Sequence, residues 1–228
     1  MASDQFFPLL SPQALAGAAP ALDRLQKVVA EMDRAYKKAS AVQDFSCNGC
    51  ENNCCYTWFF HHTLAEALFL ARACAGLSPE VLARAEDQAR SVMAKHTAHD
   101  ADQGPFRAAC PLFSSGLCMV YDSRPMICRL HGVPYRLLQP GGSYHIGPGC
   151  AAFHNAVGEN GKNAQVMDRT PLYVAMSKLE TQMRKGSEFS GKARYTIAGL
   201  MSMKDEWERL VAFFRELPRK PAQEQEAL

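Results

Sequence analysis

The cysteines constrain this chain more than any other feature of its sequence. Eight of the nine cysteines fall into two dense groups. The first group is Cys47-x2-Cys50-x3-Cys54-Cys55, and the second comprises Cys110, Cys118, Cys128 and Cys150. Thiols gathered like this in a protein of the cell interior usually hold metal, because thiolates are good ligands for zinc and iron. We therefore expect an irregular centre built around a metal ion or an iron–sulfur cluster.

Disulfide bonds are the main alternative use for these thiols. The N-terminus has no basic segment followed by an apolar run, and no stretch has the uncharged apolar length that spans a bilayer. We therefore expect a cytoplasmic protein, in which thiols stay reduced. The cysteine count is odd, and a bridge between the neighbours Cys54 and Cys55 would be strained. Metal binding is thus favoured over a disulfide framework.

The composition predicts a globular chain without a strong electrostatic preference for a partner. Hydrophobic residues make up 47% of the 228 residues, which is enough to bury a core. The formal net charge is only +2, which gives no reason to expect binding to nucleic acid or to a membrane. We expect a protein partner instead, of a kind that the sequence does not identify.

Helical periodicity flanks the cysteine groups on both sides. Apolar residues recur at three- and four-residue steps, and Thr63 and Glu66 have the spacing of a capping box. Ser78-Pro79 and Thr170-Pro171 are typical helix starts. We expect helices over residues 21–38, from Thr63 to near Gly76, from Ser78 to about Lys95, from Thr170 onward, and around Trp207 to Leu217.

The region between these helices carries few helix signals. Residues 96–108 have the composition of a polar loop, and residues 110–154 lack helical periodicity. Alternating apolar residues on either side of Gln139–Ser143 predict a small β-hairpin. The expected fold is mainly α, a helical framework around an irregular cysteine-rich metal-binding centre with a small β-hairpin.

One compact domain with three segments is expected. Residues 1–43 would form an N-terminal helical segment, and residues 44–155 the cysteine-cluster core, including two helices within 63–95. Residues 156–228 would supply the C-terminal helices, with a disordered tail from Pro218.

The spacing of the thiols suggests more than a single mononuclear site. Cys47 and Cys50 can supply two ligands from one turn, and Cys54 is near enough to join them. Cys55 fits the same ion poorly, because neighbouring side chains diverge. Two centres, or one polynuclear cluster, would accommodate both. The predicted metal ligands are Cys47, Cys50, Cys54, Cys55, Cys110, Cys118, Cys128 and Cys150.

The spacing of the cysteines also bears on the choice between zinc and an iron–sulfur cluster. The irregular gaps in the second group do not form the paired knuckles of common zinc fingers. Cys110-Pro111 is similar to the dipeptide that closes bacterial ferredoxin motifs. An iron–sulfur cluster is therefore favoured over Zn²⁺.

Two arginines and several histidines are candidates for supporting positions. Arg124 and Arg129 would offset a cluster's negative charge or hold an anionic substrate if they lie beside it. The alternative is that they fix the loop, which we favour for Arg124 and leave open for Arg129. His131 and His154 are the best candidates for a mixed Cys/His site. His61, just before a helix, is a further candidate.

The cysteine motifs resemble those of the YkgJ-type cysteine-cluster family. The resemblance rests on the first group together with Cys110-Pro-Leu-Phe and Cys118-Met-Val-Tyr-x2-Arg-Pro-x2-Cys128-Arg, and it covers roughly residues 44–155. It implies a zinc- or iron-chelating domain. Some members are labelled iron–sulfur oxidoreductases by inference, and flagellin lysine methylases contain a similar module. The family does not fix an activity.

Three functions remain open at this point. The first is a redox or accessory protein that carries a cluster, and the second is a structural zinc module for protein–protein interaction. The third is a metal-dependent modifying enzyme, for which Glu51 and Asp122 are the nearest candidate bases. No phosphate-binding glycine loop, nucleophile elbow or dinucleotide fingerprint is present.

Overall fold

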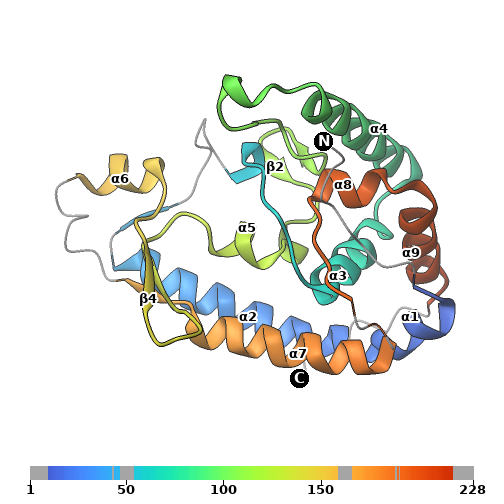
Figure 1. Ribbon diagram of the computed structural model, residues 1–228, viewed down its shortest axis with the longest axis horizontal. Coiled ribbons are helices and arrows are strands. Elements are labelled where there is room, and N and C mark those ends of the chain that lie inside the picture. The colour runs from blue at the N-terminus through green and yellow to red at the C-terminus, as the bar shows by residue number, and fades with distance from the viewer. Residues whose placement is uncertain are drawn as a thin grey trace.

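Helices surround an irregular centre in the computed structural model, which describes residues 10–42, 44–46, 54–158, 166–187, 189 and 191–217. Figure 1 shows the long helices along one edge and a second group of helices at one end. The expected mainly helical fold with a small β-hairpin is confirmed. Within the described residues, no helix is both long enough and apolar enough to cross a membrane.

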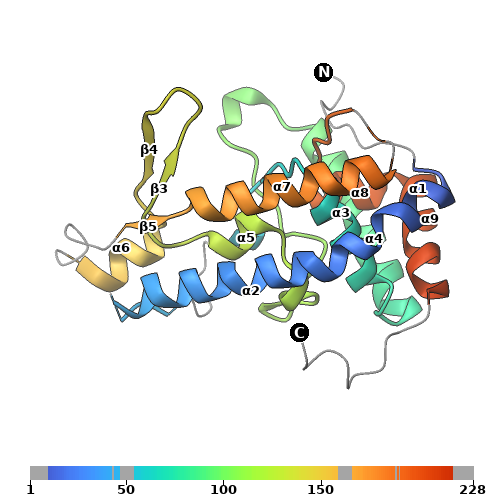
Figure 2. The ribbon, with the colours of Figure 1, turned by 90° about the horizontal axis from the view of Figure 1, so that it is seen from below.

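Two long helices lie side by side along the molecule. Helix α2 (Pro20–Ala41) and helix α7 (Thr170–Ser187) run next to each other in both ribbon views (Figures 1 and 2). Both were expected from helical periodicity. The side chains that they bury recur at helical steps and include Leu22, Leu25, Met32, Leu172, Met176, Leu179 and Met183. The apolar stripes therefore define the pair.

A short helix, α1 (Pro12–Ala18), packs against α7 through a very close backbone approach. A Cβ atom added to Gly17 would collide with the carbonyl oxygen of Gly186 in α7. Only hydrogen fits between these two backbones, so glycine is required here by the contact. The sequence reasoning did not predict α1.

Helix α3 (Leu64–Cys74) is the central element of the helical part. Thr63 caps its N-terminus by accepting a hydrogen bond from the backbone N–H of Glu66, as the capping-box spacing predicted. Its residues are buried on all sides rather than along one stripe, which is the pattern of a helix inside a core. Cys74, at its end, is a buried thiol.

Three further helices complete one end of the molecule. Helix α4 (Pro79–Thr97) is capped by Ser78 and continues past the expected end into the predicted polar loop. Helix α8 (Ile197–Ser202) packs on α4, and helix α9 (Lys204–Glu216) packs on α3. Trp207 in α9 is buried and donates its indole N–H to Glu86 at 2.9 Å. Helix α8 was not predicted, whereas α9 was.

Two small sheets carry the irregular part. Strands β3 (Tyr135–Leu138) and β4 (Tyr144–Gly147) form the predicted antiparallel hairpin, and β5 (Met167–Asp168) pairs with β3 in parallel. Strands β1 (Phe113–Ser114) and β2 (Leu117–Cys118) form a second, tighter hairpin.

The expectation that residues 110–154 contain little helix is wrong at two places. Helix α5 (Met126–Leu130) and helix α6 (Ala151–Val157) lie there. Both are too short for a 3.6-residue period to be recognisable. Three short 3₁₀ turns, η1 (Cys54–Tyr56), η2 (Ala101–Gln103) and η3 (Tyr121–Ser123), complete the described elements. The predicted tail from Pro218 lies outside the described residues.

Candidate metal centre

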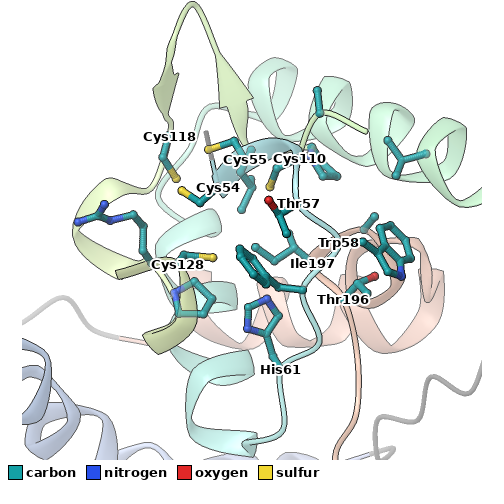
Figure 3. Close-up of a pocket in the computed structure, with 18 of the residues that line it drawn as sticks. Cys54, Cys55, Thr57, Trp58, His61, Cys110, Cys118, Cys128, Thr196 and Ile197 are labelled. Carbon is teal, nitrogen blue, oxygen red and sulfur yellow. The ribbon is translucent and has the colours of Figure 1, made fainter. Parts of the chain in front are cut away.

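A cavity of about 60 Å³ lies between the cysteine-bearing segments and the helices α3, α4 and α8. Five cysteines line it: Cys54, Cys55, Cys110, Cys118 and Cys128. Figure 3 shows their side chains gathered around one end of the cavity. They come from η1, from the loop before β1, from β2 and from α5. The fold thus brings together cysteines of both sequence groups.

Backbone pairing joins the two cysteine groups directly. The N–H of Cys110 donates to the carbonyl of Cys55 at 2.7 Å. An antiparallel bridge between Thr57 and Arg107 continues this pairing. The two chain segments are therefore in register next to the cavity, although more than fifty residues separate them in the sequence.

A two-residue turn places Cys118. Ser115 and Gly116 both have positive φ, at 49° and 84°, as a type I′ hairpin requires. The turn aligns Cys118 opposite Phe113 across the β1–β2 pair. The N–H of Met119 then donates to the carbonyl of Leu112 at 2.9 Å. This geometry fixes the backbone on either side of the Cys118 thiol.

Two carboxyl side chains from the helices hold α5 and, with it, Cys128. Glu66 of α3 accepts a hydrogen bond from the N–H of Met126, the first residue of α5, at 2.7 Å. Arg129 donates to both carboxylate oxygens of Asp33 in α2 at 2.7 Å, and to the carbonyl of Asp122 at 2.7 Å. Cys128 lies between these two anchors in the sequence, so its position depends on α2 and α3.

The adjacent cysteines of η1 differ in protonation. The Cys55 thiol donates a hydrogen bond to Cys54, and the guanidinium of Arg124 lies nearby, which together lower the pKa of Cys54 to about 7 against the opposing effect of burial. The same hydrogen bond and burial raise the pKa of Cys55. Cys54 is thus the more acidic thiol of the pair.

Burial raises the pKa of the other three thiols at the cavity. It raises that of Cys110 to about 12 and that of Cys128 well above the ordinary value, and Cys118 shifts in the same direction. Negative charge on neighbouring cysteines contributes in each case. These thiolates therefore repel one another in a poorly solvated place, and a bound cation would offset both penalties. The donor set suits zinc or iron.

The two candidate arginines have different environments. Arg124 lines the cavity, donates its Nε–H to the carbonyl of Tyr121 at 2.9 Å, and stacks over the Tyr121 ring at 3.5 Å. It therefore fixes the η3 turn and also places a positive charge near Cys54 and Cys118. Arg129 is buried in its ion pair with Asp33 and does not line the cavity.

Three predicted or candidate ligands lie away from this cavity. Cys150 caps helix α6, where its sulfur accepts the N–H of Phe153 at 3.4 Å. His131 lies against Phe59 with 5.4 Å between ring centroids, and His154 lies against Phe153 with 5.6 Å. The predicted ligands Cys47 and Cys50, and the candidate base Glu51, lie outside the described residues.

His61 is the histidine that does line the cavity. Its side chain is almost fully buried, and burial lowers its pKa to about 3, so the imidazole is neutral. Sequence reasoning gave His61 no preference over the other histidines. The available signal was its place between apolar Phe59 and the helix cap Thr63, which marks a residue that enters the core. The opposite wall is formed by Thr196 to Ala198 at the start of α8. No motif in the sequence marks these residues as part of a site.

Two histidines within residues 96–108, the segment expected to be a polar loop, make defined contacts. His96 stacks on the indole of Trp58 with 4.3 Å between ring centroids. His99 places Nε2 2.8 Å from the carbonyl oxygen of Gly104. Both contacts stabilise the segment that leads from α4 toward Cys110.

The seven cysteines within the described residues are free thiols. In that same part of the chain, no three His, Cys, Asp or Glu side chains already form the ligand set of a metal ion. The cavity therefore collects thiols of suitable chemistry without converging them on a single point.

Comparison with known proteins gives one match. No curated protein and no solved structure matches the chain. The matching family model spans residues 46–137, about two fifths of the chain, and includes all five cavity cysteines. Its description supports metal binding by this segment. Residues 46–137 match the family described as "CxxCxxCC: Putative zinc- or iron-chelating domain", which is the cysteine-cluster family that the motifs resemble.

Proposed function

We propose that the cavity holds a metal centre, an iron–sulfur cluster in preference to zinc, and that the protein has a redox or accessory role. The observation that carries this proposal is the gathering of five cysteines from both sequence groups around one cavity. Cys54, Cys110, Cys118 and Cys128 are the proposed ligands, and Cys47, Cys50 and Cys55 are the further thiols available to the same segment.

A polynuclear centre fits the spread of the thiols better than a single ion does. One ion needs three or four donors in a single coordination sphere, and the described residues hold no such ready set. In a cluster each iron takes its own thiolate, so the sulfur atoms need not converge. Cys150 lies away from the cavity, and a ligand role for it would require a second centre.

The surroundings of the cavity suit electron transfer. A cluster would supply a one-electron couple, and its potential would depend on charge, burial and hydrogen bonding around the sulfur atoms. Arg124 adds positive charge beside Cys54 and Cys118, which favours the more negative, reduced state. Trp58, Phe59 and Leu112 line the cavity and limit the access of water. Exclusion of water disfavours that added negative charge, so these apolar side chains would lower the potential, whereas the charge of Arg124 would raise it.

The first experiment is an analysis of metal and acid-labile sulfide in protein purified without oxygen. Iron with sulfide in equal amounts, and broad thiolate-to-iron absorbance, would support the cluster. Zinc without sulfide would instead support the second candidate, a structural zinc module. That candidate has its own support, because the thiols connect short irregular segments that a bound ion would order. The absence of both metals would contradict the proposal.

Cysteine variants then assign the ligands. Cys110→Ser, Cys118→Ser and Cys128→Ser are each expected to lose most of the metal. Cys74→Ala is the matched control, because Cys74 is buried in α3 but does not line the cavity. Cys54→Ser and Cys55→Ser should lose different amounts if the two thiols serve different centres. Full retention in both variants would defeat the idea of two centres.

A further inference from the structure

Two buried polar atoms of the side chains that line the cavity have no partner in the described part of the chain, Nε1 of Trp58 and Nδ1 of His61. Nδ1 of His61 makes no hydrogen bond within the described residues, although the side chain is only 3% exposed. A buried imidazole nitrogen without a partner is destabilising, because it has lost its hydrogen bonds to water and gained none. In Figure 3 the His61 ring points from below toward the space that the cysteines border. The proposed metal ligands explain the thiols there but leave this nitrogen unexplained.

The backbone holds His61 rigidly. Its N–H donates to the carbonyl of Tyr195 at 2.7 Å, and its carbonyl accepts the N–H of Tyr195 at 3.1 Å. The hydroxyl of Tyr195 donates to the carbonyl of Thr63 at 3.0 Å, which braces the same strand segment. The imidazole is therefore presented to the cavity by paired segments rather than by a mobile loop, as expected for a group that orients a ligand.

Much of the remaining cavity wall is apolar. Leu70, Val92 and Ile197 are among the residues that form its wall. At about 10–15 Å³ for each water that a cavity holds, a volume of about 60 Å³ gives room for about four to six water-sized groups. The cavity thus admits a small linear ligand.

We propose that this cavity binds a small linear ligand, of the size of azide, which accepts a hydrogen bond from Nδ1–H of His61 while its other end reaches the metal centre. The inference rests on the proposed metal centre and adds to it an open position on the side of His61. His61 would be a positioning residue, because it acts on the ligand and is not itself a ligand of the metal.

The test is an azide titration of the metal-loaded protein, followed by the change in its absorbance spectrum. The unaltered protein should bind azide saturably. His61→Leu removes the donor while keeping an apolar side chain, and it should weaken azide binding about tenfold. His61→Asn, whose amide nitrogen lies near the place of Nδ1, should restore most of the affinity. Ala198→Val narrows the cavity and should abolish binding with the hydrogen-bond donor intact.

Metal content and circular dichroism are measured on every variant, which separates the possible failures. Equal azide affinity in His61→Leu and the unaltered protein would overturn the inference. Loss of metal from a folded His61→Leu would also overturn it, because His61 would then be a metal ligand. Metal with no azide binding in the unaltered protein would overturn the inference and leave the proposed function standing. Absence of metal would overturn both.

Discussion

The two halves of this molecule are held together in different ways. The helical frame, consisting of α2, α3, α7 and α9, is joined by fully buried apolar side chains such as Leu22, Leu68 and Trp207. The cysteine centre, consisting of η1, the β1–β2 hairpin and α5, is joined by single backbone hydrogen bonds and by two charged anchors. The frame is a core in the ordinary sense, whereas the centre is a set of short segments attached to it.

The difference has an energetic consequence. Each fully buried leucine or phenylalanine contributes about 1.5–3 kcal/mol, while a net backbone hydrogen bond contributes about 1 kcal/mol. The centre also gathers thiols that disfavour one another's ionisation. The frame can therefore persist without metal, and the centre gains most of its order from whatever the thiols bind.

The largest expected effect is on the local stability of the centre when metal is removed. Hydrogen exchange at Met119 and at Cys110 should speed up by orders of magnitude after chelation, because ligation supplies the folding free energy of such segments. Amides inside α3 and α7 should change little. Uniform loss of protection across both regions would show that the frame depends on the metal and would remove the distinction.

The anchor between Arg129 and Asp33 should give the next largest effect. The Arg129 side chain is 2% exposed and that of Asp33 is 51% exposed, so Asp33→Ala leaves a buried cation with only the carbonyl of Asp122. We expect a loss of about 2–3 kcal/mol in the free energy of unfolding, below the full cost for a wholly buried pair. Denaturant unfolding would measure it.

Asp87→Ala is the matched control for that variant. It removes the partner of Arg90 in an ion pair that is exposed on both sides. Such surface pairs contribute about 0–1 kcal/mol. A similar loss in both variants would mean that burial of Arg129 does not matter. A larger loss of metal from Asp33→Ala than from Asp87→Ala would link the anchor to Cys128.

Within the frame, adding a single methyl group at the contact between α1 and α7 should lower the free energy of unfolding. Gly17→Ala places a Cβ against the carbonyl of Gly186, where the two backbones leave no room, and we expect a loss of about 1–3 kcal/mol. Gly186→Ala should have a similar effect through the reciprocal contact, and the two losses should not add. Thermal unfolding of the two single variants and the double variant checks this. Additive losses would show that each glycine matters for a separate reason.

The smallest effect concerns the pH dependence of the free energy of unfolding that arises from Glu66, which holds α5 through the N–H of Met126. Burial raises the pKa of Glu66 above its usual 4.5, so between the two pKa values the folded state binds more protons than the unfolded state. The contribution of Glu66 to the free energy of unfolding is thus largest below pH 4.5. It falls as the pH rises from there through the raised pKa. Glu66→Gln should remove this slope while still accepting the N–H of Met126.

Stability curves of the unaltered protein and of Glu66→Gln from pH 4 to 8 would isolate this group by difference. Glu66→Ala serves as the comparison, because it leaves the Met126 N–H without its acceptor and should cost about 1–3 kcal/mol at all pH values. Identical pH profiles for the unaltered protein and Glu66→Gln would mean that Glu66 does not titrate in this range.

The contrast between the two regions also explains what the sequence could predict. The longer helices carry recognisable signals: Leu172 to Met183 shows a full apolar stripe, and Thr63 and Ser78 mark the starts of α3 and α4. Helix α5 has only five residues and has no side-chain cap, so periodicity cannot find it. The Ser115-Gly116 dipeptide is by contrast a local turn signal for the β1–β2 hairpin.

The candidate site was predictable in its chemistry more than in its geometry. The motifs identified the cysteines, and the residues between them could be assigned to a loop. Which thiols meet depends on contacts between distant segments, such as Cys110 with Cys55 and Arg129 with Asp33. His61 enters the cavity because Tyr195 pairs with it, and a partner so far along the chain leaves no local pattern.

The pairing of His61 with Tyr195 also sets an order of assembly during synthesis. The two residues are 134 positions apart, so the cavity has no wall from α8 until the last part of the chain has been made. Every cysteine leaves the ribosome before Tyr195 does, because chains emerge from the N-terminus. The thiols are therefore open to whatever delivers their metal while the chain is still being extended, and the final helices close the site over it.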